Sequence, residues 1–192
     1  NQIAIGMLGR FDPLKDYENF IKASIETAEY YENVVFVLVG RNVDHNNHFL
    51  TSLIENSGFK DRFFLLGERD DVPTLLNMLD IFCLSSKSEG FPNVVAESMA
   101  CSVPCVVTDV GDAARIVGSN GVVVPPMDYI ALALGLGFLI DVGADQRSQI
   151  GEKARLSIQE NYSIDAISRR YLSLYQRGGY KKSSGEQSKL VQ

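Results

Sequence analysis

The sequence predicts an α/β fold: a Rossmann-like, three-layer α/β/α arrangement built on a six-stranded parallel sheet. Six short apolar runs alternate with helical stretches, which is typical of successive βαβ units. The runs are continuously apolar, as expected for strands that are buried on both faces. With 192 residues, of which 45% are hydrophobic and 22% charged, the chain suits one soluble domain with a sizeable core.

Three strand–helix pairs occupy the first half of the chain. The first helix has apolar residues at helical spacing and charged residues on its other face. The second closes at Gly58, a residue type favoured after helix C-termini, and the third has Pro73 near its first turn. The expected strands are 3–8, 34–39 and 63–67, and the expected helices start at 17, run from about 48 to 57, and start at 71.

The second half repeats the alternation and then becomes helical. Gly90 and Pro92 end regular structure between the fourth strand and its helix. The expected strands are 80–84, 104–108 and 121–124, with helices at 94–100 and 112–117 between them. Three further helices are expected at 129–140, 146–160 and 163–176, and the polar, unpatterned tail 179–192 is expected to be disordered.

Charged residues and glycines follow several strands directly. The carboxyl ends of parallel strands meet at one edge of the sheet, and ligands of such sheets bind outside that edge. We therefore expect one binding rim, formed by Arg10, Lys15, Gly40, Glu68, Arg69, Glu89 and Gly90.

The stretch from Ser86 to Ala100 is the centre of this predicted rim. A strand, a turn and a helix N-terminus direct backbone N–H groups and a positive dipole end at an anion. Glu89 lies in the turn, and Glu97 lies about one turn inside a mostly apolar helix. Considered alone, Glu89 is expected to be an ordinary carboxylate in a surface loop. Considered alone, Glu97 is expected to be capped by neighbouring backbone groups or by a nearby cation. The pair, with seven residues between them across Gly-Phe-Pro, indicates a site.

Composition excludes several classes of protein. A formal charge of −6 argues against a nucleic-acid partner. Cys83, Cys101 and Cys105 lack metal-ligand spacing and are expected to be reduced core thiols of a cytoplasmic protein. His45 and His48 lie in a polar run without companions at metal spacing, so no metal site is expected. No stretch suggests a membrane span or a signal peptide.

Catalytic motifs of other α/β proteins are absent from the sequence. No Gly-x-Gly-x-x-Gly and no Gly-x4-Gly-Lys-Ser/Thr follows a strand, which disfavours a dinucleotide-dependent dehydrogenase and a P-loop NTPase. No Gly-x-Ser-x-Gly elbow indicates an α/β-hydrolase.

From Ile3 to about Gln176, the order and spacing of several short motifs resemble the C-terminal, donor-binding half of the family 4 retaining glycosyltransferases, which have the GT-B architecture. The matching motifs are Leu8-Gly9-Arg10-Phe11 with Lys15-Asp16, Val39-Gly40, Leu66-Gly67 with Asp71-Val72-Pro73, Ser85-Ser86 to Glu97, and Ser102-Val103-Pro104-Cys105-Val106-Val107.

The resemblance implies a role for each matching residue. Arg10 and Lys15 bind the donor diphosphate, Glu89 contacts the sugar and takes part in catalysis with them, and Glu97 holds the ribose. Alternatively, Arg10 and Lys15 are ordinary surface cations. The further implied donor-binding positions are Gly90, Phe91, Asn93 and Val94 around the helix start, and Gly40, Arg69 and Val72 at the base pocket.

Two positions depart from the family pattern. The family usually has Gly-Gly-x-x-Glu after its fifth strand, and here Arg115 stands at the position of the glutamate. Before that strand the family prefers glycine, and here the residue is Ser102.

The resemblance implies that residues 1–178 form a nucleotide-sugar-binding domain and that an N-terminal acceptor domain is absent from this chain. The implied enzyme is a metal-independent hexosyltransferase without a cofactor, using a UDP- or GDP-type donor and a glycan or lipid-linked acceptor, in cell-surface polysaccharide synthesis. We expect it in the cytoplasm, or at the inner face of the membrane through the full-length protein. The alternatives are a nucleotide-sugar-binding module without transferase activity and a half domain like those of the sugar-nucleotide 2-epimerases.

Overall fold

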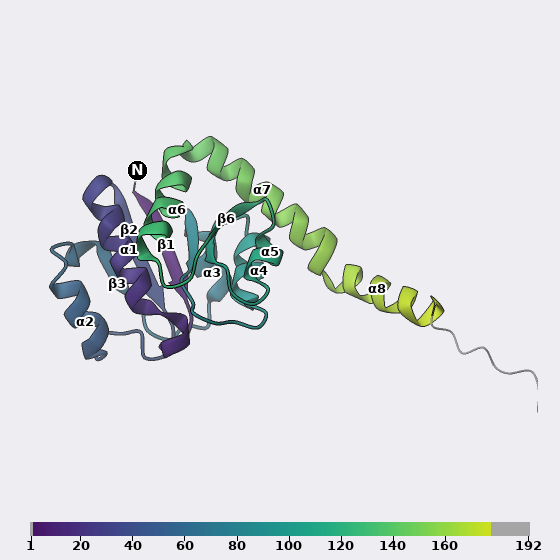
Figure 1. Cartoon of the computed structure of the whole chain (residues 1–192), viewed down its shortest axis with the longest axis horizontal. Coiled ribbons are helices and arrows are strands. Elements are labelled where there is room, and N and C mark those ends of the chain that lie inside the picture. The colour runs from purple at the N-terminus through teal and green to yellow at the C-terminus, as the bar shows by residue number, and fades with distance from the viewer. Residues whose placement is uncertain (1, 178–192) are drawn as a thin grey trace, which may run out of the picture.

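The computed structural model describes residues 2–177 and confirms the predicted α/β class. Its core is one six-stranded, all-parallel sheet with the order β3-β2-β1-β4-β5-β6 (Figure 1). The strands are β1 (Ile3–Leu8), β2 (Val34–Val39), β3 (Phe63–Leu65), β4 (Ile81–Leu84), β5 (Cys105–Thr108) and β6 (Gly121–Val124). Each lies where the sequence predicts it, with small differences at the ends.

The helices also follow the predicted order. Two short 3-10 helices, η1 (Pro13–Lys15) and η2 (Lys60–Arg62), precede α1 and β3. The α-helices of the sheet region are α1 (Tyr17–Tyr30), α2 (His48–Glu55), α3 (Val72–Asn77), α4 (Asn93–Ala100), α5 (Ala113–Val117) and α6 (Tyr129–Asp141). They are followed by α7 (Gly143–Tyr162) and α8 (Ile164–Arg177). The predicted disordered tail lies outside the described residues.

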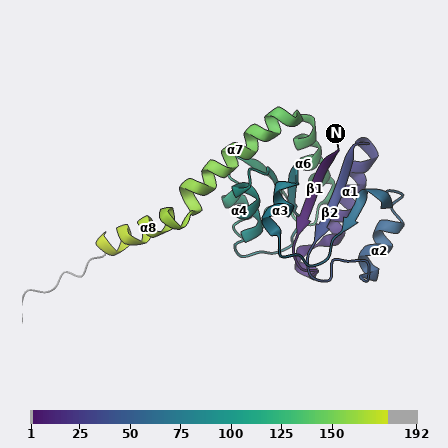
Figure 2. The same cartoon turned by 180° about the vertical axis from the view of Figure 1, so that it is seen from behind.

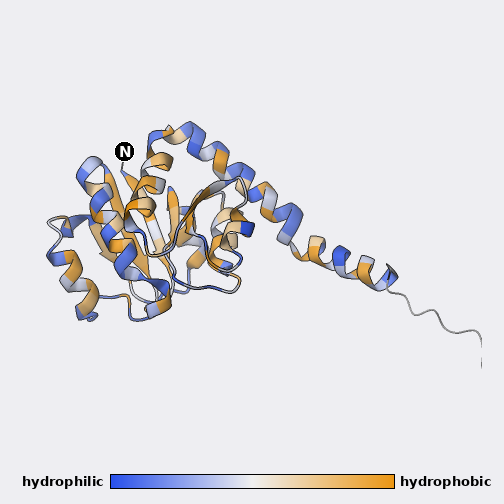
Figure 3. Ribbon diagram, viewed as in Figure 1, coloured by the Kyte–Doolittle hydropathy of each residue, from blue (hydrophilic) through white to orange (hydrophobic). Residues whose placement is uncertain are grey.

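Two hydrophobic clusters, one on each face of the sheet, make three layers. The first contains α1, α2 and α6 packed on side chains such as Phe36 and Cys83. The second contains α3, α4, α5 and α7 packed on side chains such as Phe82 and Cys105. Figure 3 shows hydrophobic strands between helices whose outer faces are more hydrophilic. The thiols of Cys83 and Cys105 are buried and unpaired, as predicted, and burial raises the pKa of both.

Strand order reverses at β1. The chain passes from β1 outward to β2 and β3, and then returns to place β4 on the other side of β1, where Ile5 pairs with Ile81. A doubly wound sheet has its ligand crevice at this reversal, outside the carboxyl ends of the strands. The loops after β1 and β4 therefore flank the position where a ligand is expected.

The amino end of the sheet is closed by α7. The buried guanidinium of Arg147 donates to the carbonyl of Leu139 at the end of α6 and lies 3.7 Å from a carboxylate oxygen of Asp80. Asp80 in turn accepts a hydrogen bond from the backbone N–H of Ala4, at 2.8 Å. Helix α7 starts at Gly143, earlier than the predicted residue 146.

Helix α8 extends away from the domain (Figures 1 and 2). The sequence predicts one apolar stripe along this helix, and the side chains of the stripe are exposed. Ile164 is 84% exposed, Tyr171 59% and Tyr175 75%. The stripe thus has little cover from the described part of the chain.

Candidate functional site

The loop after β1 is held in a fixed shape by contacts at both of its ends. The buried phenol of Tyr17, whose pKa is raised by burial, donates a hydrogen bond to the carbonyl of Gly9. Gly40, which follows β2, packs against the same carbonyl: a Cβ on Gly40 would lie 1.8 Å from that oxygen. The φ of +150° at Gly40 also disfavours any side chain. The carboxyl ends of β1 and β2 are therefore in close contact.

This loop presents Arg10 to solvent. The guanidinium Nε of Arg10 donates to Asp12 at 3.2 Å, and 64% of its side chain is exposed. The other oxygen of Asp12 accepts the N–H of Leu14 and caps η1. This backbone hydrogen bond, followed by the contact with Arg10, lowers the pKa of the Asp12 carboxyl. Asp12 thus orients a cation that keeps most of its surface free.

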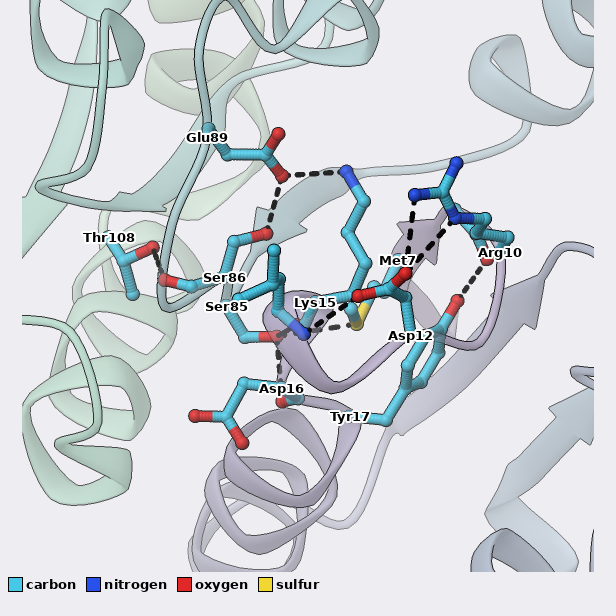
Figure 4. A network of polar contacts seen from close by, with 12 residues as sticks. Met7, Arg10, Asp12, Lys15, Asp16, Tyr17, Ser85, Ser86, Glu89 and Thr108 are labelled. Carbon is cyan, nitrogen blue, oxygen red and sulfur yellow. Dashed lines mark hydrogen bonds and ion pairs between the residues drawn. The ribbon is translucent and has the colours of Figure 1, made fainter.

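The second cation, Lys15, lies against Glu89 of the loop after β4 (Figure 4). The ammonium nitrogen is 2.6 Å from Oε1 of Glu89, although the two residues are 74 positions apart in sequence. The hydroxyl of Ser86 donates to the same oxygen at 2.7 Å. Both charged side chains are largely buried, with 21% and 13% of their surfaces exposed. The predicted convergence of Lys15 and Glu89 is confirmed.

Ser85 and Lys87 join the two loops. The hydroxyl of Ser85 lies 2.9 Å from the carbonyl oxygen of Lys15, and the N–H of Lys87 donates to the carbonyl of Leu14 at 2.8 Å. The ammonium of Lys87 also lies 3.1 Å from the buried carboxylate of Asp16. The position of Lys15 relative to Glu89 is therefore set by main-chain contacts as well as by the ion pair.

The loop after β5 supports the same turn from its other side. Thr108, the last residue of β5, donates its hydroxyl to the carbonyl of Ser86 at 2.7 Å (Figure 4). The N–H of Asp112 donates to the carbonyl of Gly90. Gly111, at a φ of +53°, lies so close that a Cβ there would be 2.3 Å from the carbonyl oxygen of Glu89. The loops after β1, β4 and β5 thus fix the backbone around Glu89 together.

The Lys15–Glu89 pair is not saturated. Among residues 2–177, the second carboxylate oxygen of Glu89 and the remaining N–H bonds of Lys15 have no protein partner. A partly buried ion pair with free hydrogen-bonding capacity suits a ligand that carries both an anionic group and hydroxyl groups, because each kind of group then finds its complement.

Glu97 differs from the sequence-based interpretation. The apolar sequence of α4 suggested a carboxylate among apolar neighbours, yet the side chain lies on the exposed face of that helix. Asn93 shares this exposed face, while Val94 is half-buried. The apolar residues of α4 point instead to the sheet and to α7, as shown by buried Val95 and Met99.

Phe91 joins the loop of Glu89 to the end of α7. Its ring lies 5.7 Å from the ring of Tyr162, centroid to centroid. Phe91, Asn93, Glu97 and Tyr162 border a shallow depression beside α4. The residues around the predicted ribose position therefore lie at the surface.

The other predicted donor-binding residues lie on the same rim but outside the Lys15–Glu89 network. Arg69 forms a two-pronged ion pair with Asp71, at 2.8 and 2.9 Å, and this pairing lowers the pKa of the Asp71 carboxyl. Val72 begins α3 and is half-buried. Arg115, the departure from the family pattern, is exposed and paired with Asp112 at 2.9 Å.

Several residues of the network were not among the predicted site residues. Ser86, Thr108 and Tyr17 contact the loops of the site through partners distant in sequence or through the backbone. A partial signal exists for two of them, because Ser86 and Thr108 are polar residues at the carboxyl ends of apolar strands.

The described part of the chain was also searched for metal-binding clusters and for single helices that could cross a membrane. No group of three or more His, Cys, Asp or Glu side chains there is arranged to hold a metal ion. Within residues 2–177 no single helix has both the length and the hydropathy needed to cross a membrane.

The sequence matches the protein family described as "Glycosyl transferases group 1" over residues 1–157. The chain is 33% identical over 129 residues to the N-acetyl-alpha-D-glucosaminyl L-malate synthase of Bacillus anthracis, covering 66% of this chain and 33% of that protein. It is 30% identical over 144 residues to the UDP-Gal:alpha-D-GlcNAc-diphosphoundecaprenol alpha-1,3-galactosyltransferase of Escherichia coli, covering 74% and 33%. The matched segments thus span about one third of the length of these relatives.

Solved structures share the fold. Anabaena Alr3699/HepE in complex with UDP and glucose is similar with a TM-score of 0.80 and 25% identity, covering 92% of this chain and 49% of that one. The C-terminal domain of a glycosyl transferase group 1 family protein, LpcC of Francisella tularensis, is similar with a TM-score of 0.74 and 25% identity, covering 84% of this chain and 87% of that one.

Proposed function

The chain belongs to the glycosyl transferases group 1 family, and from this premise we propose that it is the donor-binding domain of a retaining glycosyltransferase. It binds a UDP- or GDP-type nucleotide sugar. As part of a longer protein, it serves transfer of the hexose to a glycan or lipid-linked acceptor in cell-surface polysaccharide synthesis. The Escherichia coli relative, named for such a transfer, and the complex of the Anabaena protein with UDP and glucose support this proposal.

The single observation that carries the proposal is the unsaturated Lys15–Glu89 pair beside Arg10, at the reversal of strand order. Arg10 and Lys15 bind the diphosphate and offset the charge that develops on it as it departs, which is an electrostatic form of catalysis. Helix α4 adds to this, because Pro92 before it offers no side-chain cap and leaves its first N–H groups for an anion. No divalent metal is then needed for this step.

The two glutamates of the motif divide the donor between them. Glu89, next to the cations, faces the sugar with its free oxygen. Glu97, exposed on α4, holds the ribose hydroxyls, with Gly90, Phe91, Asn93 and Val94 around the turn. Gly40, Arg69 and Val72 border the base. The whole assignment places the donor along the carboxyl ends of the strands.

Calorimetric titration with UDP and with GDP, each with and without EDTA, tests the proposal. We expect binding of at least one nucleotide that EDTA does not change. Lys15→Ala should weaken it about tenfold or more, the effect of losing one hydrogen bond to a charged group. Lys22→Ala is the matched control, because Lys22 pairs with Glu18 on the outer side of α1. Strict dependence on Mg²⁺ would contradict the metal-free assignment.

A second test concerns transfer itself. We expect the chain to bind donor but not to transfer sugar alone, because the matched segment covers only 33% of each of these two relatives and an acceptor must also be positioned. Such positioning accounts for roughly 7–11 kcal/mol of a barrier. The exposed stripe of α8 is the surface that we expect to pack on the remainder of the protein. Steady transfer by the isolated chain, at rates on the order of 1 per second, would refute this.

A further inference from the structure

Within the proposed function, we infer that Ser86 is a positioning residue, which keeps Glu89 directed at the donor sugar when Lys15 turns to the diphosphate. The starting observation is that one carboxylate oxygen of Glu89 receives both donors, the ammonium of Lys15 at 2.6 Å and the hydroxyl of Ser86 at 2.7 Å (Figure 4). The other oxygen has no protein partner within the described residues.

The two donors differ in how firmly they are anchored. Ser86 has a short side chain, and its carbonyl is bound by the buried hydroxyl of Thr108 at 2.7 Å. Lys15 ends in an ammonium on a flexible four-carbon stem, and its three N–H bonds are free to rotate. Its backbone is held by Ser85, but its charged end is held by Glu89. Ser86 is therefore the fixed donor and Lys15 the movable one.

A bound diphosphate competes for the movable donor. It brings negative charge beside Arg10 and Lys15. The phosphate and the carboxylate of Glu89 repel each other, so it is unfavourable for both to bind the ammonium of Lys15 at once. Lys15 consequently shifts from Glu89 toward the phosphate. Glu89 would then be free to rotate, because the backbone contacts of Gly90 and Gly111 fix the main chain of the turn and not the carboxylate.

The hydroxyl of Ser86 prevents that rotation. It continues to hold Oε1, so that Oε2 stays directed away from the loop and is available to accept a hydrogen bond from a sugar hydroxyl. The inference separates two contributions to binding: Lys15 acts on the diphosphate, and Ser86 acts through Glu89 on the sugar alone. Bare nucleotide and nucleotide sugar should therefore respond differently to the loss of each.

The experiment uses the whole chain and calorimetry. The affinities of UDP and GDP are compared with those of UDP-glucose, UDP-galactose, UDP-N-acetylglucosamine and GDP-mannose. For Ser86→Ala we expect the ratio of sugar-conjugate affinity to bare-nucleotide affinity to fall about tenfold, the effect of one hydrogen bond to a charged group. The affinity for the bare nucleotide should stay within about twofold. Ser86→Thr, which keeps a hydroxyl, should restore the ratio.

Ser57→Ala is the matched control, since its hydroxyl makes a 2.6 Å bond to the carbonyl of Ile54, far along the chain from the site loops. It should leave the ratio unchanged. The inference would be overturned if Ser86→Ala left the affinity ratio unchanged for every conjugate, or weakened bare nucleotide and conjugate equally. It would also be overturned if Ser86→Thr failed to restore the ratio. A wild-type chain that binds neither UDP nor GDP would instead refute the proposed function, and the inference with it.

The movement of Lys15 has its own measurement. Glu89→Gln removes the competing charge, so the affinity for bare nucleotide should rise by about threefold to tenfold. The rise should be absent when Lys15→Ala is combined with it. An affinity that stays unchanged or falls in Glu89→Gln would show that Glu89 does not compete for Lys15, and would overturn this step.

Discussion

An ion pair at the amino end of the sheet and another at its carboxyl end differ in how fully their groups are used. At the amino end, Arg147 contacts Asp80 and also donates to the carbonyls of Leu139 and Ile140. Asp80 accepts the N–H of Ala4. At the carboxyl end, Lys15 and Glu89 hold each other but retain hydrogen-bonding capacity that residues 2–177 do not fill.

The difference separates stability from binding. The guanidinium at the amino end joins α6, α7 and the sheet, and its loss would remove a charged donor from buried carbonyls. The pair at the carboxyl end uses part of its capacity for orientation, and under the proposed function the rest is left for the donor. Substituting the pair at the amino end should therefore change the free energy of unfolding, and substituting the pair at the carboxyl end should change nucleotide affinity.

The largest expected effects come from two glycines, one at each end. A Cβ added to Gly40 would lie 1.8 Å from the carbonyl oxygen of Gly9. A Cβ added to Gly151 would lie 1.9 Å from the carbonyl oxygen of Ser102. Gly40→Ala and Gly151→Ala should each lower the free energy of unfolding by about 3 kcal/mol, the upper range for overpacking. Urea denaturation measures this. Only Gly40→Ala should also weaken nucleotide binding, since only Gly40 touches the loop of Arg10.

Gly58→Ala is the control for both glycines. Gly58 has a φ of +79°, but a Cβ there would have no atom within 4 Å, so only backbone strain of about 1–2 kcal/mol is expected. A loss at Gly58 equal to those at Gly40 and Gly151 would mean that the close contacts do not determine the cost.

The next effect concerns the pair at the amino end. Arg147→Met keeps the aliphatic stem but removes the donors to Asp80 and to the end of α6. We expect a loss of about 2–3 kcal/mol in the free energy of unfolding, because buried acceptors lose their partner. Nucleotide affinity should stay within about twofold. A selective loss of affinity, with stability intact, would break the division between the two ends.

At the carboxyl end, Glu97→Ala should weaken bare nucleotide by about 1.5–3 kcal/mol, the range for hydrogen bonds to a charged group. Its exposed side chain has little structural role, so thermal unfolding should be unchanged. Glu29→Ala, another exposed helical glutamate, serves as the control for the change in net charge. If Glu97→Ala and Glu29→Ala had equal nucleotide affinities, the assignment of Glu97 to the ribose would be wrong.

The smallest effect is a gain in stability. Ser102 has a φ of 62°, in the left-handed region that favours glycine. Ser102→Gly should therefore raise the free energy of unfolding by about 1 kcal/mol, with no change in nucleotide affinity. A loss of stability would show that the serine side chain compensates for its backbone strain.

Periodicity and strand order predicted most of the fold. Continuous apolar runs located all six strands, and their carboxyl ends located Lys15 and Glu89 on one rim. The family preference for glycine at the position of Ser102 is explained by its positive φ.

The sequence-based prediction of burial was wrong where burial depends on which elements cover a given face of a helix. Glu97 has apolar neighbours in sequence, but α4 turns those residues to the sheet and to α7 and leaves the glutamate outside. The sequence also failed to identify Ser86 and Tyr17 as site residues, because their roles depend on hydrogen bonds whose partners lie in the folded loops. Such contacts have no periodicity from which they could be predicted.

The central place of β1 has a consequence for how the chain folds. Pairing of β1 with β2 closes a short segment, whereas pairing with β4 joins residues such as Ala4 and Asp80, 76 positions apart. Closing the longer segment costs more chain entropy, and non-local contacts of this kind slow folding. Lys15 and Glu89 meet only when that closure is complete. During refolding, the capacity to bind nucleotide should accordingly appear with the slowest phase, when the two halves of the sheet join.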